Sequence, residues 1–342
     1  MRDMAQQPLS SSRQIGPAGL NRVLELVALV EDYDVAGLHA ETDGGWSLAL
    51  GKARLTWSAD GTAVTKTLVP NLVIPHWASL LGTPRQAALN ELRVNRLLSE
   101  HWPPVPVPLL LGTSRRGPSM TFEAVDGAPL GPKFPISLSG PDVDGLIAIA
   151  LALQSYQPRR RWFRRLHVER RLRLHHRSDL IGDADAAALT LLAVSAGLRW
   201  HFAHGDITAR NVLRDSQGRL VLIDWEWAGM YPAGYELAFL WFSLLEVPGA
   251  RDKVAAAVPG HHQAGFLLSA TLVQLLHLQM WLLRPNPHVA KHEETLRQLL
   301  QEVRSNSRKA RPTLAPSSVP GSPLPHSSGM ERPISHESAS SA

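Results

Sequence analysis

The sequence predicts an α+β protein with two lobes, a small antiparallel sheet with one helix followed by a mostly helical lobe. Three observations predict this class. Short runs that alternate apolar and polar residues occur in the first third of the chain and are separated by turn residues, as in antiparallel sheets. From about residue 142 onward, apolar residues recur mostly at helical spacing. The chain has 342 residues, 44% of them hydrophobic, which is enough for one large domain or two lobes.

The first half of the chain holds two groups of predicted strands with a helix between them. Asp60-Gly61 is a typical hairpin turn and joins two of the strands. Residues 84–100 predict the helix, because Pro84 suits a first helical turn and the leucines that follow recur on one side. Residues 20–31 also have helical spacing. The predicted strands are residues 46–50, 53–61, 62–69, 107–114 and 118–125.

The second half is predicted to be helical with one exception. Residues 211–227 read as two short strands around a turn at Gln217-Gly218. An antiparallel lobe joined to a helical lobe places a cleft at the junction, where ligand sites are common. The predicted helices are residues 142–155, 184–200, 233–246 and 264–283.

The two ends of the chain differ in composition from the rest. Residues 305–342 contain eleven Ser and six Pro and cannot bury enough apolar surface to offset their ordering entropy, so they predict a disordered tail. Residues 1–19 predict a flexible N-terminus. The chain has no Cys, no apolar signal region and no apolar run of about 20 residues, so a cytoplasmic protein without membrane association is expected.

The positive charge is concentrated in one segment. Residues 159–177 hold nine Arg and one Glu, whereas the rest of the chain has 26 basic and 29 acidic residues. One interpretation is a solvated helix that packs Phe163, Leu166 and Leu174 inward. The other is an anion-binding surface for a phosphorylated or carboxylated substrate, or for nucleic acid. The segment has few aromatic residues to stack bases, which argues against nucleic acid.

The stretch HGDITARNVL followed by LVLIDWEWAG holds the residues that best indicate chemistry. Asp206 is followed by Asn211 five residues later, and Asp224 ends the next apolar run. Phosphoryl transfer needs an oriented nucleophile, bound metal ions and neutralised phosphate charge. Carboxylate and amide oxygens are ligands that Mg²⁺ prefers. The stretch therefore offers one base and two metal ligands.

This stretch resembles the aminoglycoside/choline phosphotransferase family, which has a protein-kinase-like fold. The resemblance implies that Asp206 is the base that orients the substrate hydroxyl and that His204 braces its loop. It also implies that Asn211 and Asp224 are the metal ligands. Arg210 departs from the family, which usually has Gly before the Asn.

The resemblance extends across roughly residues 45–240. It implies that Lys66, at the end of a strand, contacts the nucleotide phosphates, and that Glu91 on the following helix orients Lys66. MTFEAVDG is similar to the family's hinge, where the backbone of Glu123, Ala124 and Val125 meets the adenine edge. In YELAFL, Glu236 replaces the family's Asp and is expected to anchor the catalytic loop. The Gly-rich loop has two candidates, at residues 44–47 and 51–52, and neither is a full motif.

The resemblance implies an ATP-dependent O-phosphotransferase with Mg²⁺ that acts on a small hydroxylated metabolite or antibiotic. Residues 20–124 are then the nucleotide-binding N-lobe and residues 125–304 the helical C-lobe with the catalytic loop and acceptor site. The alternative is a pseudokinase or interaction module that has the fold but little turnover. Intact Asp206, Asn211, Asp224 and Lys66 favour the enzyme. The acceptor and the oligomeric state do not follow from the sequence.

Overall fold

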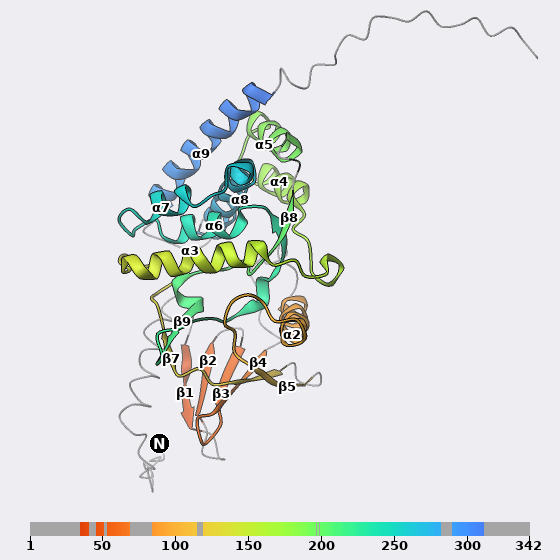
Figure 1. Ribbon diagram of the computed structural model, residues 1–342. Coiled ribbons are helices and arrows are strands. Elements are labelled where there is room, and N and C mark those ends of the chain that lie inside the picture. Colours follow the sequence, from red (N-terminus) through yellow and green to blue (C-terminus); the bar gives the residue numbers. More distant parts are fainter. Residues whose placement is uncertain are drawn as a thin grey trace, which may run out of the picture.

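The computed structural model divides into a sheet-containing N-lobe and a helical C-lobe (Figure 1). It describes residues 35–40, 46–50, 53–68, 84–114, 119–195, 197, 199–281 and 289–310. The predicted helix at 20–31 and the candidate Gly-rich loop at 51–52 lie outside these residues, as do residues 44–45 of the other candidate loop. The predicted α+β class with two lobes is confirmed.

The N-lobe is built on a six-stranded antiparallel sheet. Its strand order is β1-β2-β3-β4-β6-β5. The Asp60-Gly61 turn joins β3 to β4 as predicted: the Asp60 carboxylate accepts hydrogen bonds from Ser58 and Thr62, and Gly61 has a φ of 72°. The strands are β1 (Val35–Ala40), β2 (Trp46–Leu50), β3 (Ala53–Trp57), β4 (Ala63–Leu68), β5 (Leu110–Ser114) and β6 (Ser119–Glu123).

Helix α2 (Pro84–Glu100) begins and ends where the sequence predicts. It packs on both lobes. Leu92 is buried with Ala53 and Met120 of the sheet. Val94 and Leu98 belong instead to the large apolar core of the C-lobe. Because α2 shares apolar contacts with both lobes, the residues on it are held in a fixed position at their junction.

The C-lobe is mostly helical, with two small sheets beside the cleft. One sheet has the order β10-β9-β7, and the other pairs β11 with β8. Its strands are β7 (Gly127–Pro129), β8 (Trp200–Ala203), β9 (Val212–Asp215), β10 (Leu220–Leu222) and β11 (Gly229–Pro232). Its α-helices are α3 (Gly140–Ser155), α4 (Val168–Arg177), α5 (Asp183–Ser195), α6 (Tyr235–Ser243), α7 (Ala250–Ala256), α8 (Gln263–Trp281) and α9 (Val289–Ala310).

Two predicted limits differ markedly from the structure. The helix expected at 184–200 ends at Ser195, because Trp200 instead begins β8 and pairs with Pro232 of β11. Helix α9 continues to Ala310, six residues past the predicted limit of the C-lobe. It is held there by Ser307, which is buried and donates a hydrogen bond to the Ala188 carbonyl. Residues 311–342 lie outside the described part of the chain.

The Arg-rich segment 159–177 is only partly helical. A short 3₁₀ helix spans Arg160–Trp162, and α4 starts at Val168. Between them, residues 164–166 run beside β11, where Leu166 N–H donates to the Met230 carbonyl at 2.9 Å. Phe163 is buried as expected, whereas Leu166 and Leu174 are half-buried. The prediction of one solvated helix over the whole segment is therefore wrong.

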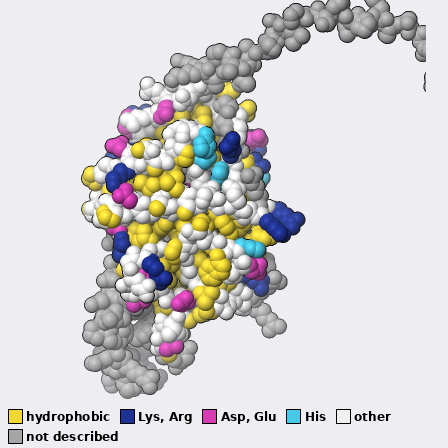
Figure 2. Space-filling model, in the orientation of Figure 1, with side chains coloured by type: hydrophobic (Ala, Val, Ile, Leu, Met, Phe, Trp, Pro, Cys, Tyr) yellow, Lys and Arg dark blue, Asp and Glu magenta, His cyan; other side chains and the backbone are white. Residues whose placement is uncertain are grey.

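The surface and the helices carry two further observations. On the face seen in Figure 2, Lys and Arg side chains are dispersed among apolar, acidic and neutral ones, so this face is not a continuous basic surface. Among the described residues, no helix is both long and apolar enough to cross a membrane.

Candidate active site

The His-Gly-Asp stretch forms a buried loop between β8 and β9. Asp206 is 6% exposed and Asn211 is 3% exposed. The Asn211 side-chain amide donates to the Asp206 carbonyl oxygen at 2.8 Å and to Asp206 Oδ2 at 3.1 Å. A short 3₁₀ helix, Ala209–Asn211, turns the chain back between the two residues. The structure therefore joins the predicted base and one predicted metal ligand in a single hydrogen-bonded loop.

His204 connects this loop to the end of β10. Its Nε2 atom lies 2.8 Å from the Ile223 carbonyl oxygen, and the Asp206 N–H donates to its Nδ1 atom at 3.3 Å. These partners require a proton on Nε2 and none on Nδ1. Burial lowers the pKa of His204, which favours this neutral ring. Through these contacts His204 links the Asp206 loop to the segment that follows β10.

Gly205 and Glu236 fix the other side of the loop. Gly205 has a φ of 86°, and a Cβ atom there would lie 2.6 Å from the Trp227 carbonyl oxygen, so no side chain fits. Its N–H donates to Glu236 Oε1 at 2.7 Å. Burial is the main reason that the pKa of Glu236 rises to about 8, and the charge of Asp206 adds to the rise. Glu236 is positioned to anchor the loop from the start of α6.

Asp224 follows β10 and meets the N-lobe. Its backbone is left-handed, with φ 64° and ψ 62°, a conformation that Asp adopts more readily than most residues. Lys66 Nζ lies 2.6 Å from Asp224 Oδ1 and 2.7 Å from Glu91 Oε1. The predicted Lys66–Glu91 contact is thus present, and Lys66 also links the helix α2 to Asp224.

The acidic groups around Lys66 suit a divalent cation. Carboxylate oxygens of Glu91, Asp224 and Glu226 lie within 4.8 Å of one another. Burial raises the pKa of Glu91, the negative charges of Asp224 and Glu226 add to that rise, and Lys66 opposes it. Oxygen donors of this kind are those that Mg²⁺ takes from proteins. Asn211 is adjacent, because its carbonyl oxygen accepts the Ile223 N–H at 2.9 Å.

The predicted hinge lies at the end of β6. The Glu123 N–H donates to the Leu109 carbonyl and the Ala124 N–H to the Thr62 carbonyl, so both amides are used within the N-lobe. The Val125 carbonyl accepts the Gly127 N–H. Within the described part of the chain, the Val125 amide has no acceptor. It is therefore the one amide of the three that remains available to a ligand edge.

Sequence reasoning missed two cations beside Asp206. Lys133 Nζ lies 3.3 Å from Asp206 Oδ1, and an Arg210 guanidinium nitrogen lies 3.9 Å from Asp206 Oδ2. Arg210 was noted only as a departure from the family pattern. Lys133 gave one weak signal, since it is one of six Lys in an Arg-rich chain. Its loop reaches Asp206 because Leu130 N–H donates to the carbonyls of Ala209 and Val212.

The model of the phosphotransferase enzyme family (APH) matches residues 79–267, more than half of the 342-residue chain. The chain belongs to this family, as the resemblance in its motifs predicted. No curated protein matches the sequence.

Two solved structures show the same fold. Choline kinase LicA from Streptococcus pneumoniae has 12% sequence identity and a TM-score of 0.50, with 83% of this chain and 99% of that chain covered. A choline/ethanolamine kinase family protein from Mesorhizobium loti has 13% identity and a TM-score of 0.52, with 85% and 99% covered. At these identities the likeness concerns the fold.

Proposed function

We propose that the protein transfers the γ-phosphoryl group of ATP, with Mg²⁺, to a hydroxyl group of a small metabolite or antibiotic. One observation carries this proposal. A carboxylate in a hydrogen-bonded loop, Asp206, lies beside a second site in which Lys66 joins Glu91 and Asp224. Asn211 bonds to both parts, through its side chain to Asp206 and through its carbonyl to Ile223 N–H.

The nucleotide is proposed to bind between Lys66 and the hinge. A compact ammonium such as that of Lys66 suits the phosphate oxygens, and its contact with Glu91 holds it at the end of β4. The backbone of Glu123, Ala124 and Val125 is proposed to meet the adenine edge, with the Val125 amide as donor. Membership of a phosphotransferase family and the kinase fold of the two solved structures support a nucleotide site here.

Asp224 and Asn211 are proposed to hold Mg²⁺ through a carboxylate and an amide oxygen. When bound, the ion would neutralise charge on the nucleotide phosphates. Lys66 contacts Asp224 at its Oδ1 atom, at 2.6 Å. Glu226 and Glu91 add negative charge within 4.8 Å, which favours a cation at this place.

Asp206 is proposed to act as the general base. Its carboxylate accepts the proton of the acceptor hydroxyl, whose oxygen then forms the new bond to the γ-phosphorus while the bond from that phosphorus to the β–γ bridging oxygen breaks. ADP leaves, and the proton on Asp206 passes to solvent. Asn211 and His204 orient the Asp206 loop through the contacts described above.

The alternative, a pseudokinase or interaction module, is less well supported. A binding module has no need for a base, a phosphate-binding lysine and two oxygen ligands together. The family and the solved kinases with this fold favour a phosphotransferase.

A screen of ATP consumption tests the proposed function. Purified protein with Mg-ATP is incubated with amino alcohols, sugars and aminoglycosides, and ADP is measured. At least one acceptor should raise ADP formation above the rate without acceptor, and Asp206→Asn should remove that increase. Failure to bind any nucleotide in calorimetry would favour the interaction module instead.

A further inference from the structure

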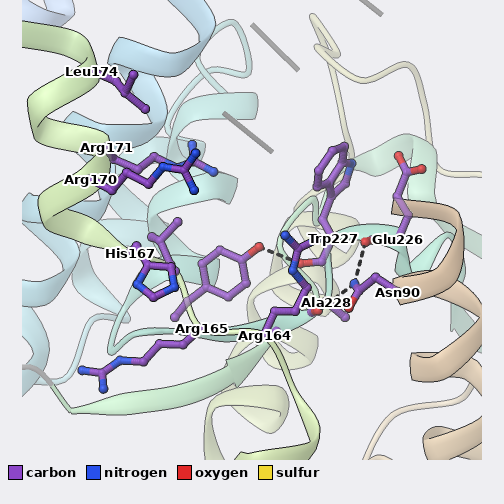
Figure 3. A pocket seen from close by; sticks show the side chains of 13 residues that line it. Asn90, Arg164, Arg165, His167, Arg170, Arg171, Leu174, Glu226, Trp227 and Ala228 are labelled. Atoms are coloured by element: carbon purple, nitrogen blue, oxygen red, sulfur yellow. Dashed lines mark hydrogen bonds between the residues drawn. The ribbon is translucent and has the colours of Figure 1, made fainter. Parts of the chain in front are cut away.

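An open pocket lies between α2, the Arg-rich segment and the residues that follow Asp224. It has room for about 100 Å³. One wall carries Arg164, Arg165, His167, Arg170 and Arg171. Figure 3 shows that the Arg171 side chain extends from α4 and that Arg164 lies beside Trp227. The proposed reaction assigns no role to these arginines.

Backbone hydrogen bonds hold Arg164 and its neighbours against β11. Met230 N–H donates to the Arg164 carbonyl at 2.6 Å, and Leu166 N–H donates to the Met230 carbonyl at 2.9 Å. Gly229 lets the two segments approach, because a Cβ atom there would lie 2.7 Å from the Arg164 carbonyl oxygen. The part of the wall that carries Arg164 is therefore fixed to β11, a few residues after Asp224 in the chain.

The positive charge of this wall is not matched by acidic groups. Among the described residues, no carboxylate forms an ion pair with Arg164, Arg170 or Arg171. Arg165 differs, since its guanidinium stacks on the Trp200 ring at 3.7 Å. The one acidic residue that lines the pocket is Glu226. Guanidinium groups gathered in this way suit a phosphate or carboxylate, which they bind with paired hydrogen bonds.

The pocket lies next to the loop that carries Asp206. Gly205, its neighbour in the chain, packs so closely that an added Cβ atom would lie 2.6 Å from the Trp227 carbonyl oxygen and 2.8 Å from the Tyr231 hydroxyl. Both Trp227 and Tyr231 line the pocket. Burial raises the pKa of Tyr231, while the charges of Arg171 and Arg164 oppose that rise and the charge of Asp206 adds to it. Tyr231 thus experiences both the arginines and the proposed base.

We propose that the acceptor substrate carries an anionic group, a phosphate or carboxylate, which binds in this pocket through Arg164, Arg170 and Arg171. The proposal rests on the proposed function, because it assigns the hydroxyl end of the acceptor to Asp206. A hydroxylated anion would then bind with its charged end among the arginines. A polycation such as an aminoglycoside would meet repulsion there.

A broad anion-binding surface, such as one for nucleic acid, is a different arrangement. It would use Arg173 and Arg177 as well, which are exposed on α4 but do not line the pocket. These two arginines provide a matched control. They lie on the same helix, carry the same charge, and Arg173 makes only a loose pair with Glu169 at 3.9 Å.

Calorimetry with small anions tests the proposal independently of turnover. Inorganic phosphate and acetate are each titrated into the full chain saturated with AMP-PNP and Mg²⁺, so that the nucleotide site is occupied. The variants are Arg164→Gln/Arg171→Gln, the control Arg173→Gln/Arg177→Gln, and Arg170→Gln. The last is exposed, so it tests the pocket without altering the half-buried Arg171.

At least one anion should bind the wild type. Its affinity for Arg164→Gln/Arg171→Gln should be at least tenfold lower, as expected for lost charged hydrogen bonds. Arg170→Gln should lower the anion affinity to a smaller extent, and the affinity of the control variant should stay within about twofold of the wild-type value. Which anion binds more tightly separates a phosphate from a carboxylate. No binding of either anion to the wild type, or an equal loss in the control, would overturn the proposal. If AMP-PNP itself does not bind, the proposed function fails, and titration of the anions alone still tests the pocket.

Discussion

The ammonium nitrogen of Lys133 lies 3.3 Å from Oδ1 of Asp206, and both side chains are largely buried. The same nitrogen lies 5.9 Å from the centres of the Phe134 and Phe239 rings. A cation in this position can hold the carboxylate in one orientation and attract the phosphoryl group in transfer. We therefore expect the charge of Lys133 to act on the reaction together with Asp206, the proposed base.

Replacing Lys133 with Gln should lower kcat by roughly 10- to 100-fold, since a charged hydrogen bond contributes about 1.5–3 kcal/mol. The affinity for Mg-ATP should change much less, because Lys66 and the hinge are untouched. Steady-state kinetics beside nucleotide titration measure both. Lys253→Gln is the control, since Lys253 pairs with Asp144 on the surface. Equal kcat values for Lys133→Gln and wild type would exclude a role for this cation.

We expect the stability of the protein to depend on pH because the pKa of Glu236 is raised in the folded state. Burial raises its pKa from 4.5 to about 8, so the folded state binds a proton that the unfolded state releases between these values. The contribution of Glu236 to the free energy of unfolding therefore falls as pH rises through this window, by at most about 1.4 kcal/mol per pH unit. Glu236→Gln cannot titrate, yet it keeps an oxygen for the Gly205 N–H.

Urea unfolding from about pH 5 to about pH 8 should show a shallower loss of stability for Glu236→Gln than for wild type. Glu169→Gln serves as the control, because the Glu169 side chain is 85% exposed. Parallel profiles for Glu236→Gln and wild type would mean that Glu236 is ionised in the folded protein across the whole range.

Metal dependence tests the role of Asp224. ATP should bind wild type markedly more tightly with Mg²⁺ than with EDTA, because the proposed ligands hold the ion against the phosphates. Asp224→Ala should lose most of this difference and most of the turnover together. Calorimetry in both conditions measures the effect, and Asp144→Ala, an exposed carboxylate, is the control. A full Mg²⁺ effect in Asp224→Ala would exclude it as a ligand.

Two truncations test whether the last turns of α9 stabilise the protein. Deleting residues 311–342 should leave Tm essentially unchanged, because their composition predicts disorder. Deleting residues 305–342 also removes Ser307, whose hydroxyl bonds to Ala188 and Val303. One buried hydrogen bond contributes about 1 kcal/mol, so Tm should fall by roughly 2 °C or more. Thermal unfolding followed by circular dichroism measures both, and equal Tm values would mean that the last turns of α9 do not stabilise the C-lobe.

Local signals predicted most of the N-lobe, but they did not predict β1 (Val35–Ala40). Helix α2 was predicted to the residue, because Pro84 and the spacing of its leucines act within the helix itself. The turn at Asp60-Gly61 is local as well. Trp200 was assigned to the wrong class, since its strand exists only through pairing with β11. Contacts between distant segments override local propensity, and a single sequence does not reveal them.

The residues of the candidate site also fall into those that the sequence could indicate and those that depend on contacts between distant segments. The resemblance identified Lys66, Glu91 and Asp224, and the structure brings them together. It could not identify Lys133, whose loop is placed by backbone hydrogen bonds from Leu130 to the far side of the catalytic loop. The sequence could not predict the Arg-bearing pocket either, because the pocket depends on how residues 164–166 lie along β11.

The measurement that tests the central claim most directly is the kcat of Asp206→Asn beside its affinity for Mg-ATP. Asn keeps the shape and an oxygen for the Asn211 amide but cannot accept the hydroxyl proton. With the acceptor found in the screen, kcat should fall roughly 10²- to 10⁴-fold while the Kd for Mg-ATP stays within about twofold. An unchanged Tm shows that the variant is folded. A folded Asp206→Asn protein with full turnover would contradict the account.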